Sequence, residues 1–274
     1  KIGAKHPDKY VLGLAYSYYR LPPLEIEKME PNVAIAFCQT RSLMMLDPKE
    51  RAARFAEREE WWKKLPSGVI YQWEYNLSQL GRATRKQEGQ LRGVPVFIPT
   101  VLQEDIRALA GKSKGEFVEC AYTGDGKMLN PGINHLGYAL QARLYWEPDL
   151  DVDAFINDYC RAFFGPAAEE MREFYQFAEE VWMRPVSRQI TLTGGFIRPA
   201  DVDRYFEILE RAKAKASGDE ARRIDVILAE CQPMKEIFPA LQRQGPDFAA
   251  PRAGDKPKVD GDLSKPFWTG ADAP

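Results

Sequence analysis

The sequence has no long apolar run and very little histidine. No stretch approaches the roughly 18 consecutive apolar residues of a membrane-spanning helix, so no membrane span is expected. Only two of the 274 residues are histidines, His6 and His135, and they lie far apart in the sequence. A histidine-based metal site is therefore not expected, and no cofactor is predicted.

Cysteine and excess charge are equally scarce. The four cysteines form no CxxC pair, which argues against a zinc site or a dense disulfide framework and favours small apolar core residues. The net charge is only −2, with basic and acidic residues mixed along the chain. No basic patch therefore predicts a nucleic-acid partner. The cysteines are Cys38, Cys120, Cys160 and Cys231.

What remains is the composition of a soluble globular protein. Hydrophobic residues make up 45% and charged residues 28% of the chain, which is typical of this class. The length suits one large domain or two ordinary ones. The first residue is Lys1, and nothing near it resembles a signal peptide. Both ends look like cuts from a longer protein, so we expect adjoining domains of the same chain.

The first half of the sequence alternates strands with helices. Such alternation predicts parallel strands joined by right-handed crossovers. Strands are expected at residues 10–18, 32–38, 68–75, 94–98 and 116–121. Helices are expected at residues 48–65, 81–92 and 101–111.

Residue size alternates within the first two strands. Leu12, Leu14 and Tyr16 alternate with small residues, and residues 32–38 repeat the pattern. Bulky residues on one face would pack under helices, while small ones would suit a curved, crowded interior. An open doubly wound sheet would more often be bulky on both faces. The sequence therefore favours an α/β fold containing about five strands, the C-terminal part of a TIM-like (β/α)8 barrel, with about three further strands upstream.

The second half is helical. Asp151 is a plausible N-cap, and Gly165 and Pro166 form a stop signal. Helices are expected at residues 132–146, 151–164, 167–183, 199–216 and 219–239. The expected domains are a partial barrel at 1–148, a helical region packed on it at 149–243, and a linker with the first residues of another module at 244–274.

Two glutamates near strand ends are the candidate catalytic residues. Glu74 shares its strand face with Gln72, opposite Tyr71 and Trp73, and aromatic surroundings would raise its pKa as a general acid requires. Glu119 would be its partner, because glycoside hydrolysis commonly uses two carboxyl groups roughly 5 or 6.5–9.5 Å apart. The alternatives are that Glu74 pairs with a structural arginine and that Glu119 forms an ion pair. Side chains on opposite faces of the sheet would exclude the pairing.

Other side chains are expected around the same barrel mouth as substrate-binding residues. Aromatic rings would stack on sugar rings, and His135 would hydrogen-bond a hydroxyl group. The alternatives are core positions for Trp73 and the tyrosines, a turn role for Asp125, and a carbonyl-capping role for His135. These residues are Tyr18, Tyr19, Arg20, Trp73, Tyr75, Tyr122, Asp125, Asn134 and His135. The predicted partner is a carbohydrate.

Several segments together resemble the bacterial family called domain of unknown function 4838. They are residues 15–18 (AYSY), 22–23 (PP), 31–33 (PNV), 71–75 (YQWEY), 136–148 (LGYALQARLYWEP) and 163–166 (FFGP). That family is similar to glycoside hydrolases of the α-glucuronidase and hexosaminidase type. The resemblance implies a TIM-like barrel, work on polysaccharides, and secretion or a periplasmic location. It supplies no catalytic residues, so an activity rests on analogy. The alternatives are a catalytically inactive sugar-binding barrel and a helical protein-interaction scaffold.

The last residues carry a second resemblance. Residues 259–263 (VDGDL), Trp268 and Ala271 resemble the first strand and turn of family 9-like carbohydrate-binding modules. The alternative is a disordered tail with one tryptophan.

Overall fold

The computed structural model describes residues 2–77, 93–120, 128, 130–184 and 196–236. The chain divides into two units, residues 1–239 and 240–274, and the architecture below is that of the first. The expected helix at 81–92 and the expected start of a carbohydrate-binding module lie outside the described residues. Within those ranges, no helix combines the length and apolarity needed to cross a membrane.

A four-stranded parallel sheet forms the centre of the first half. Its strands are β1 (Val11–Ala15), β2 (Val33–Gln39), β3 (Ile70–Leu77) and β4 (Ser113–Cys120). They lie side by side in chain order, β1-β2-β3-β4, and every neighbouring pair is parallel. The predicted α/β fold with parallel strands is confirmed at this level.

The β2–β3 connection contains a short helix α2 (Arg41–Met44) and the long helix α3 (Pro48–Lys64). Asp47 caps α3, because its carboxylate accepts hydrogen bonds from the backbone N–H groups of Lys49 at 2.8 Å and Glu50 at 3.1 Å. Proline at the first helical position suits this start. On its inner side, α3 packs Trp61 against the sheet residues Ala15, Ile35, Phe37 and Ile70.

The sheet therefore has a covered face and an open face. Neighbouring parallel strands place paired residues on the same side, so Gly13 and Ile35 share the covered face, as do Ala15 and Phe37. The covered face also includes Gln39, Gln72, Glu74 and Glu116. The open face includes Leu12, Leu14, Ala36, Cys38, Tyr71, Trp73, Tyr75, Phe117 and Glu119.

One expectation about the faces is wrong for β1. Its bulky residues Leu12 and Leu14 do not pack under helices; they lie on the open face and are 51% and 43% exposed. Gly13 lies on the covered face, where an added Cβ would come within 3.2 Å of the Ile35 side chain. The small residues of β1 therefore leave room for the bulky residues of β2, whose own pattern is as predicted.

The expected strand at residues 94–98 is absent. The segment is buried but belongs to no strand, and β3 pairs directly with β4. Pro95 has no N–H for a sheet ladder, which disfavours a central strand. Short apolar runs do not distinguish a buried strand from other buried segments. Here the run leads into α4 (Pro99–Leu109), and Phe97 packs against Tyr175 with ring centroids 5.2 Å apart.

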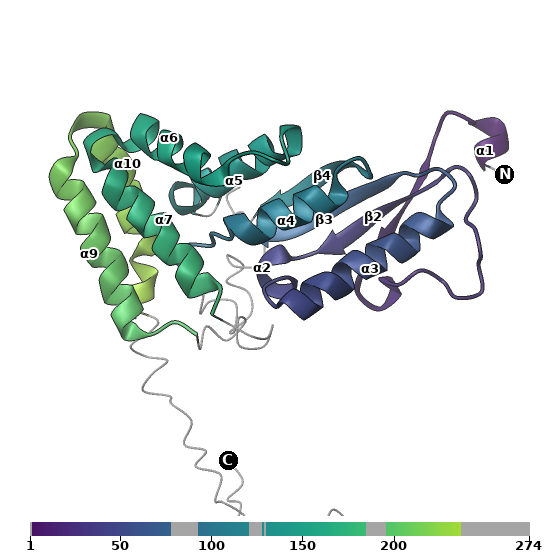
Figure 1. Cartoon of the computed structure of the whole chain (residues 1–274), viewed down its shortest axis with the longest axis horizontal. Coiled ribbons are helices and arrows are strands. Elements are labelled where there is room, and N and C mark those ends of the chain that lie inside the picture. The colour runs from purple at the N-terminus through teal and green to yellow at the C-terminus, as the bar shows by residue number, and fades with distance from the viewer. Residues whose placement is uncertain (1, 78–92, 121–127, 129, 185–195, 237–274) are drawn as a thin grey trace, which may run out of the picture. The chain divides into compact units, whose positions relative to one another are not determined.

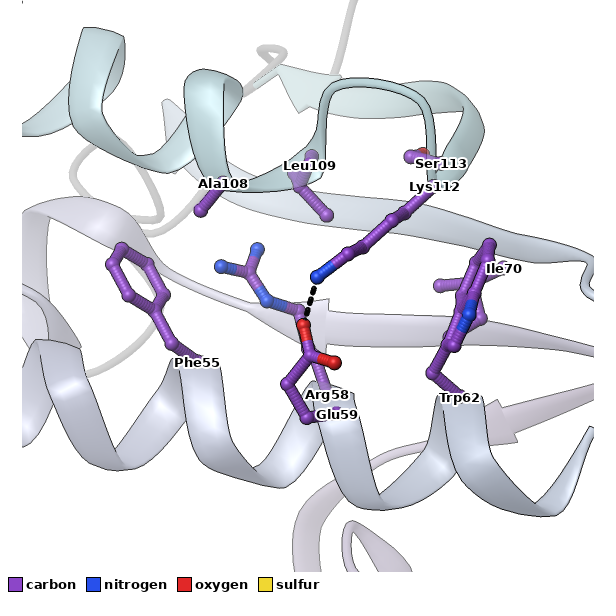
Figure 2. Close-up of a pocket in the computed structure, with 9 residues that line it drawn as sticks. All are labelled: Phe55, Arg58, Glu59, Trp62, Ile70, Ala108, Leu109, Lys112 and Ser113. Carbon is purple, nitrogen blue, oxygen red and sulfur yellow. Dashed lines mark hydrogen bonds and ion pairs between the residues drawn. The ribbon is translucent and has the colours of Figure 1, made fainter.

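Helices α3 and α4 lie beside each other on the covered face (Figure 1). Figure 2 shows the space between them, with Lys112 reaching across to Glu59. This partly open space measures about 30 Å³. Since one water needs roughly 10–15 Å³ of such volume, this space is a packing gap rather than a substrate site.

The second half of the unit is helical, as predicted. Its longer helices are α5 (Pro131–Trp146), α6 (Val152–Phe164), α7 (Ala168–Trp182), α9 (Pro199–Lys215) and α10 (Gly218–Cys231). Asp151 caps α6 by accepting a hydrogen bond from the N–H of Ala154 at 2.9 Å, as expected. α7 connects this region to the sheet, since the Trp182 indole N–H donates to the Ser42 carbonyl at 3.2 Å. Shorter helices are α1 (Ile2–Lys5), η1 (Ser17–Tyr19) and η3 (Gly165–Ala167).

Candidate functional site

The two predicted catalytic carboxylates do not meet. Glu74 lies on the covered face with Gln72, as predicted. In the β3–β4 register Glu74 is opposite Val118, so Glu119 points to the other face. There its carboxylate accepts a hydrogen bond from the Trp73 indole at 3.2 Å. The expected pairing of Glu74 with Glu119 is therefore corrected by the register of the two strands.

Glu74 instead belongs to a buried group of charges, the Arg41 cluster, formed by Arg41, Arg58, Glu74, Asp105 and Glu116. Arg41 is completely buried and donates from Nε to Asp105 at 2.6 Å and from Nη1 to Glu116 at 2.6 Å. Its backbone N–H donates to Glu74 Oε1 at 2.9 Å. Arg58 approaches the other Asp105 oxygen at 2.5 Å. The alternative expectation, that Glu74 pairs with an arginine, is what the structure contains.

The cluster contains one carboxyl group more than it has guanidinium groups. Burial raises the pKa of Glu74 to about 8, with Arg41 opposing the rise and Glu116 adding to it. Burial would also raise the pKa of Asp105, but Arg41 and Arg58 outweigh it and hold that pKa below its ordinary value. Burial raises the pKa of Glu116 as well, with Arg41 opposing the rise. However, Arg41 donates to both Glu116 oxygens, at 2.6 and 3.2 Å, whereas Glu74 Oε2 accepts no hydrogen bond. This geometry assigns the proton to Glu74, and with Asp105 and Glu116 ionised two positive charges balance two negative ones. An uncompensated buried charge, which would be costly, is thereby avoided.

A cleft opens at the carboxyl ends of β1, β2 and β3. Its volume is about 390 Å³, within the roughly 300–1,000 Å³ of small-ligand sites. In parallel α/β folds, ligands bind at this edge of the sheet. The residues lining this strand-end cleft are Tyr16, Ser17, Tyr18, Arg20, Cys38, Gln39, Thr40, Met44 and Tyr75.

The loop after β1 forms one wall of the cleft and is firmly attached. Arg20 donates from Nε and Nη2 to the two carboxylate oxygens of Glu57, at 2.8 and 3.0 Å. The Arg20 carbonyl accepts from the Trp61 indole at 2.7 Å. Next to this anchor, Tyr18 is fully exposed and Tyr19 is 62% exposed. Of the predicted binding residues, Tyr18, Arg20 and Tyr75 line the cleft, and Tyr19 stands beside them.

Aromatic rings line the cleft and continue beyond it along the open face of the sheet. Tyr16 and Tyr75 have ring centroids 6.0 Å apart, and Trp73 follows 6.4 Å from Tyr75. Burial raises the pKa of Cys38 to about 11, and burial likewise raises the pKa of Tyr75. At neutral pH both are therefore uncharged hydrogen-bonding groups, and the Cys38 thiol is not poised as a nucleophile.

His135 and Asn134 lie elsewhere, on α5. The two ring nitrogens of His135 contact the hydroxyl groups of Tyr159 at 2.9 Å and Tyr175 at 3.1 Å. Its ring also packs against Phe163 with centroids 4.5 Å apart. The structure therefore places His135 among α5, α6 and α7 rather than at the strand-end cleft, which corrects its expected position beside the substrate. The sequence pattern predicted that His135 lies in the first turn of a helix, but it did not predict which other helices this turn would contact.

Some site residues were predicted that the structure does not describe, and some were missed. Tyr122 and Asp125 lie outside the described residues. The lining residues that were not selected from the sequence are Tyr16, Ser17, Cys38, Gln39, Thr40 and Met44. Their position at and just after the ends of β1 and β2 was the available signal. Among the described residues, no cluster of His, Cys, Asp and Glu could hold a metal ion.

Loss of Arg41 should destabilise the protein strongly. Arg41→Met leaves Glu74, Asp105 and Glu116 buried without their shared cation, which costs about 3–5 kcal/mol. We expect this loss in urea unfolding at pH 7 and a smaller one near pH 5, where the orphaned carboxyl groups take up protons. Arg143→Met, on a half-exposed helix pair with Glu147, is the control and should cost at most about 1 kcal/mol. Equal stability of the two variants would contradict the proposed balance.

His135 should make stability fall in mild acid. Burial lowers its pKa to about 4, whereas an unfolded histidine titrates near about 6.5. Its contribution to the free energy of unfolding is therefore complete above pH 6.5. This contribution is lost as the pH falls towards 4, by roughly 3 kcal/mol at most, because the unfolded chain binds the proton more readily. The difference in unfolding free energy between wild type and His135→Gln should shrink over this range. A constant difference between wild type and His135→Gln over this range would refute the account.

Comparison with known proteins identifies a family but no activity. The family model for a domain of unknown function, DUF4838, matches residues 1–176, more than half of the 274 residues. No curated protein and no solved structure matches the chain. The likeness to glycoside hydrolases and the start of a carbohydrate-binding module stay predictions. The resemblance predicted from the sequence segments is therefore confirmed, and the chain belongs to the family described as Domain of unknown function (DUF4838).

Proposed function

We propose that this chain binds a carbohydrate in the strand-end cleft, as part of a glycoside hydrolase-like protein. The observation that carries the proposal is the combination of aromatic rings and uncharged hydrogen-bonding groups at the carboxyl edge of a parallel sheet. Tyr16, Tyr18 and Tyr75 offer apolar faces for sugar rings. The exposed Ser17 hydroxyl and the phenol groups of these tyrosines offer hydrogen-bonding groups for sugar hydroxyls. A polysaccharide ligand makes secretion or a periplasmic location part of the same proposal.

The sheet topology supports a TIM-like barrel as the setting of this site. A doubly wound sheet reverses its strand order and carries helices on both faces. Here the order follows the chain, and both α3 and α4 place residues on the covered face: Arg58 and Asp105 meet there. Sequential order with one-sided crossovers is the (β/α)8 pattern. We propose that these four strands form part of such a barrel, with the open face turned inward.

The geometry favours binding over hydrolysis. No aspartate or glutamate is among the described residues that line the strand-end cleft. Glu119 is a candidate outside this lining, since it lies on the open face and accepts a hydrogen bond from Trp73. Hydrolysis is the second candidate function, with Glu119 as acid or base and the second carboxyl group still to be found. The helical-scaffold alternative is weaker, because Tyr18 and Tyr19 are exposed rather than buried.

Removing the aromatic rings of Tyr16 or Tyr75 should weaken sugar binding. Tyr16→Ala and Tyr75→Ala should each lower affinity for the oligosaccharide that binds best by about fivefold or more, corresponding to about 1 kcal/mol per aromatic contact. Calorimetric titration against neutral, N-acetylated and acidic oligosaccharides would measure this. Tyr10→Ala is the matched control, since Tyr10 is 56% exposed but lies just before the start of β1. Equal losses at Tyr10 and Tyr75, or no binding by any glycan, would refute the proposal.

A separate prediction concerns turnover in the natural full-length protein. If hydrolysis occurs, Glu119→Gln should reduce kcat by about 10²–10⁴-fold, the usual contribution of a general acid or base. Oligosaccharide affinity should stay within a few-fold, because the amide keeps the shape and the acceptor for Trp73. Glycan release measured by reducing-end assay would decide. Turnover that survives in Glu119→Gln would remove Glu119 from the mechanism.

A further inference from the structure

We propose that Glu74 is a positioning residue for the strand-end cleft. Through Arg41, the protonation state of Glu74 determines the position of residues 40–44, which form one wall of the cleft (the Thr40–Met44 wall), and thereby the affinity for ligand. This inference rests on the proposed function. It gives the completely buried Glu74 carboxyl group a role that needs no contact with substrate.

The wall and the cluster are parts of one short segment. Gln39, Thr40 and Met44 line the cleft, and Arg41 lies between them in the chain. On the side that faces away from the cleft, Gln39 Nε2 donates to Asp105 Oδ2 at 2.8 Å. The Arg41 backbone N–H donates to Glu74 Oε1 at 2.9 Å. The segment 39–44 therefore contributes side chains to the cleft on one side and hydrogen bonds to the buried charges on the other.

The helical turn transmits a displacement along this segment. In α2, the backbone N–H of Met44 donates to the Thr40 carbonyl at 2.8 Å, and that of Met45 donates to Arg41 at 3.1 Å. On the far side, Ser42 is fixed by the Trp182 indole. A shift of Arg41 consequently moves Thr40 and Met44 relative to this fixed point.

Arg41 has two carboxyl groups competing for one end of its guanidinium. Nη1 lies 2.6 Å from Glu116 Oε1 and 3.4 Å from Glu74 Oε2. Glu74 Oε2 is buried and accepts no hydrogen bond. With Glu74 neutral, the guanidinium stays on Glu116. An ionised Glu74 draws it away, giving the cluster a second arrangement.

The surroundings of Glu74 determine the pH at which this happens. The charged groups facing it are Arg41 from α2, Glu116 from β4 and Asp105 from α4, with Arg58 of α3 behind Asp105. Burial and the two nearby carboxylates favour the neutral form, whereas Arg41 opposes them, so that the pKa of Glu74 is about 8. The change of arrangement is therefore expected in mildly alkaline solution.

The experiment follows two signals in the same samples between pH 6 and 10. One is calorimetric affinity for the best-binding oligosaccharide, and the other is the NMR shift of the Met44 methyl group without ligand. In wild type, affinity should fall at least about threefold, and the methyl signal should move, both with midpoints near pH 8. Glu74→Gln mimics the protonated acid. It should keep the wild-type affinity of pH 6 within about twofold and abolish both transitions.

The outcomes separate this inference from the proposed function. A Met44 transition that Glu74→Gln abolishes, without glycan binding at any pH, supports the wall coupling and refutes the function. Glycan binding without a Met44 transition near pH 8 refutes the wall coupling and leaves the function standing. A transition that persists in Glu74→Gln also overturns the inference. If Glu74→Gln does not fold, Glu116→Gln serves instead: freeing Arg41 for Glu74 should lower the midpoint, and an unchanged midpoint would contradict the proposal.

Discussion

The structure of the first half depends on how a buried arginine is neutralised. Arg41 has no exposed surface, so its charge must be paired inside the protein. Its carboxylate partners come from α4, β3 and β4, and Arg58 of α3 joins through Asp105. Such a cluster fixes the covered face at one register, because a slip of one residue would move Glu74 or Glu116 to the open face.

The alternation of side chains along the strands places the buried charged residues on one face of the sheet and the candidate binding residues on the other. On the covered face, β3 contributes Gln72 and Glu74, which are completely buried. On the open face the same strand contributes Trp73 and Tyr75, which are partly exposed. The charged groups therefore stabilise the sheet from one side, while the aromatic groups remain available on the other. The proposed sugar site uses the second set, and the proposed coupling joins the two sets through the segment that follows β2.

Much of this could be predicted from local sequence, and the rest required contacts between distant segments. Alternating strands and helices, the cap at Asp151 and the face of Glu74 within its own strand follow from short-range pattern. Whether Glu119 shares that face depends on the β3–β4 register, which includes irregularities that no local pattern reveals. Residues 94–98 are apolar enough for a strand, but Pro95 and the direct β3–β4 pairing leave no place for one. His135 is helical as expected, yet its neighbours come from α6 and α7.

Direct titration of Glu74 is the measurement that tests the central claim most closely. The claim is that the Arg41 cluster is neutral at physiological pH because Glu74 holds a proton. Carbon-13 NMR of the Glu74 side-chain carboxyl group, assigned by comparison with Glu74→Gln, reports that proton. The account predicts a midpoint near pH 8. A midpoint below pH 5 would mean that an additional negative charge is tolerated beside Arg41, and it would contradict both the charge balance and the coupling built on it.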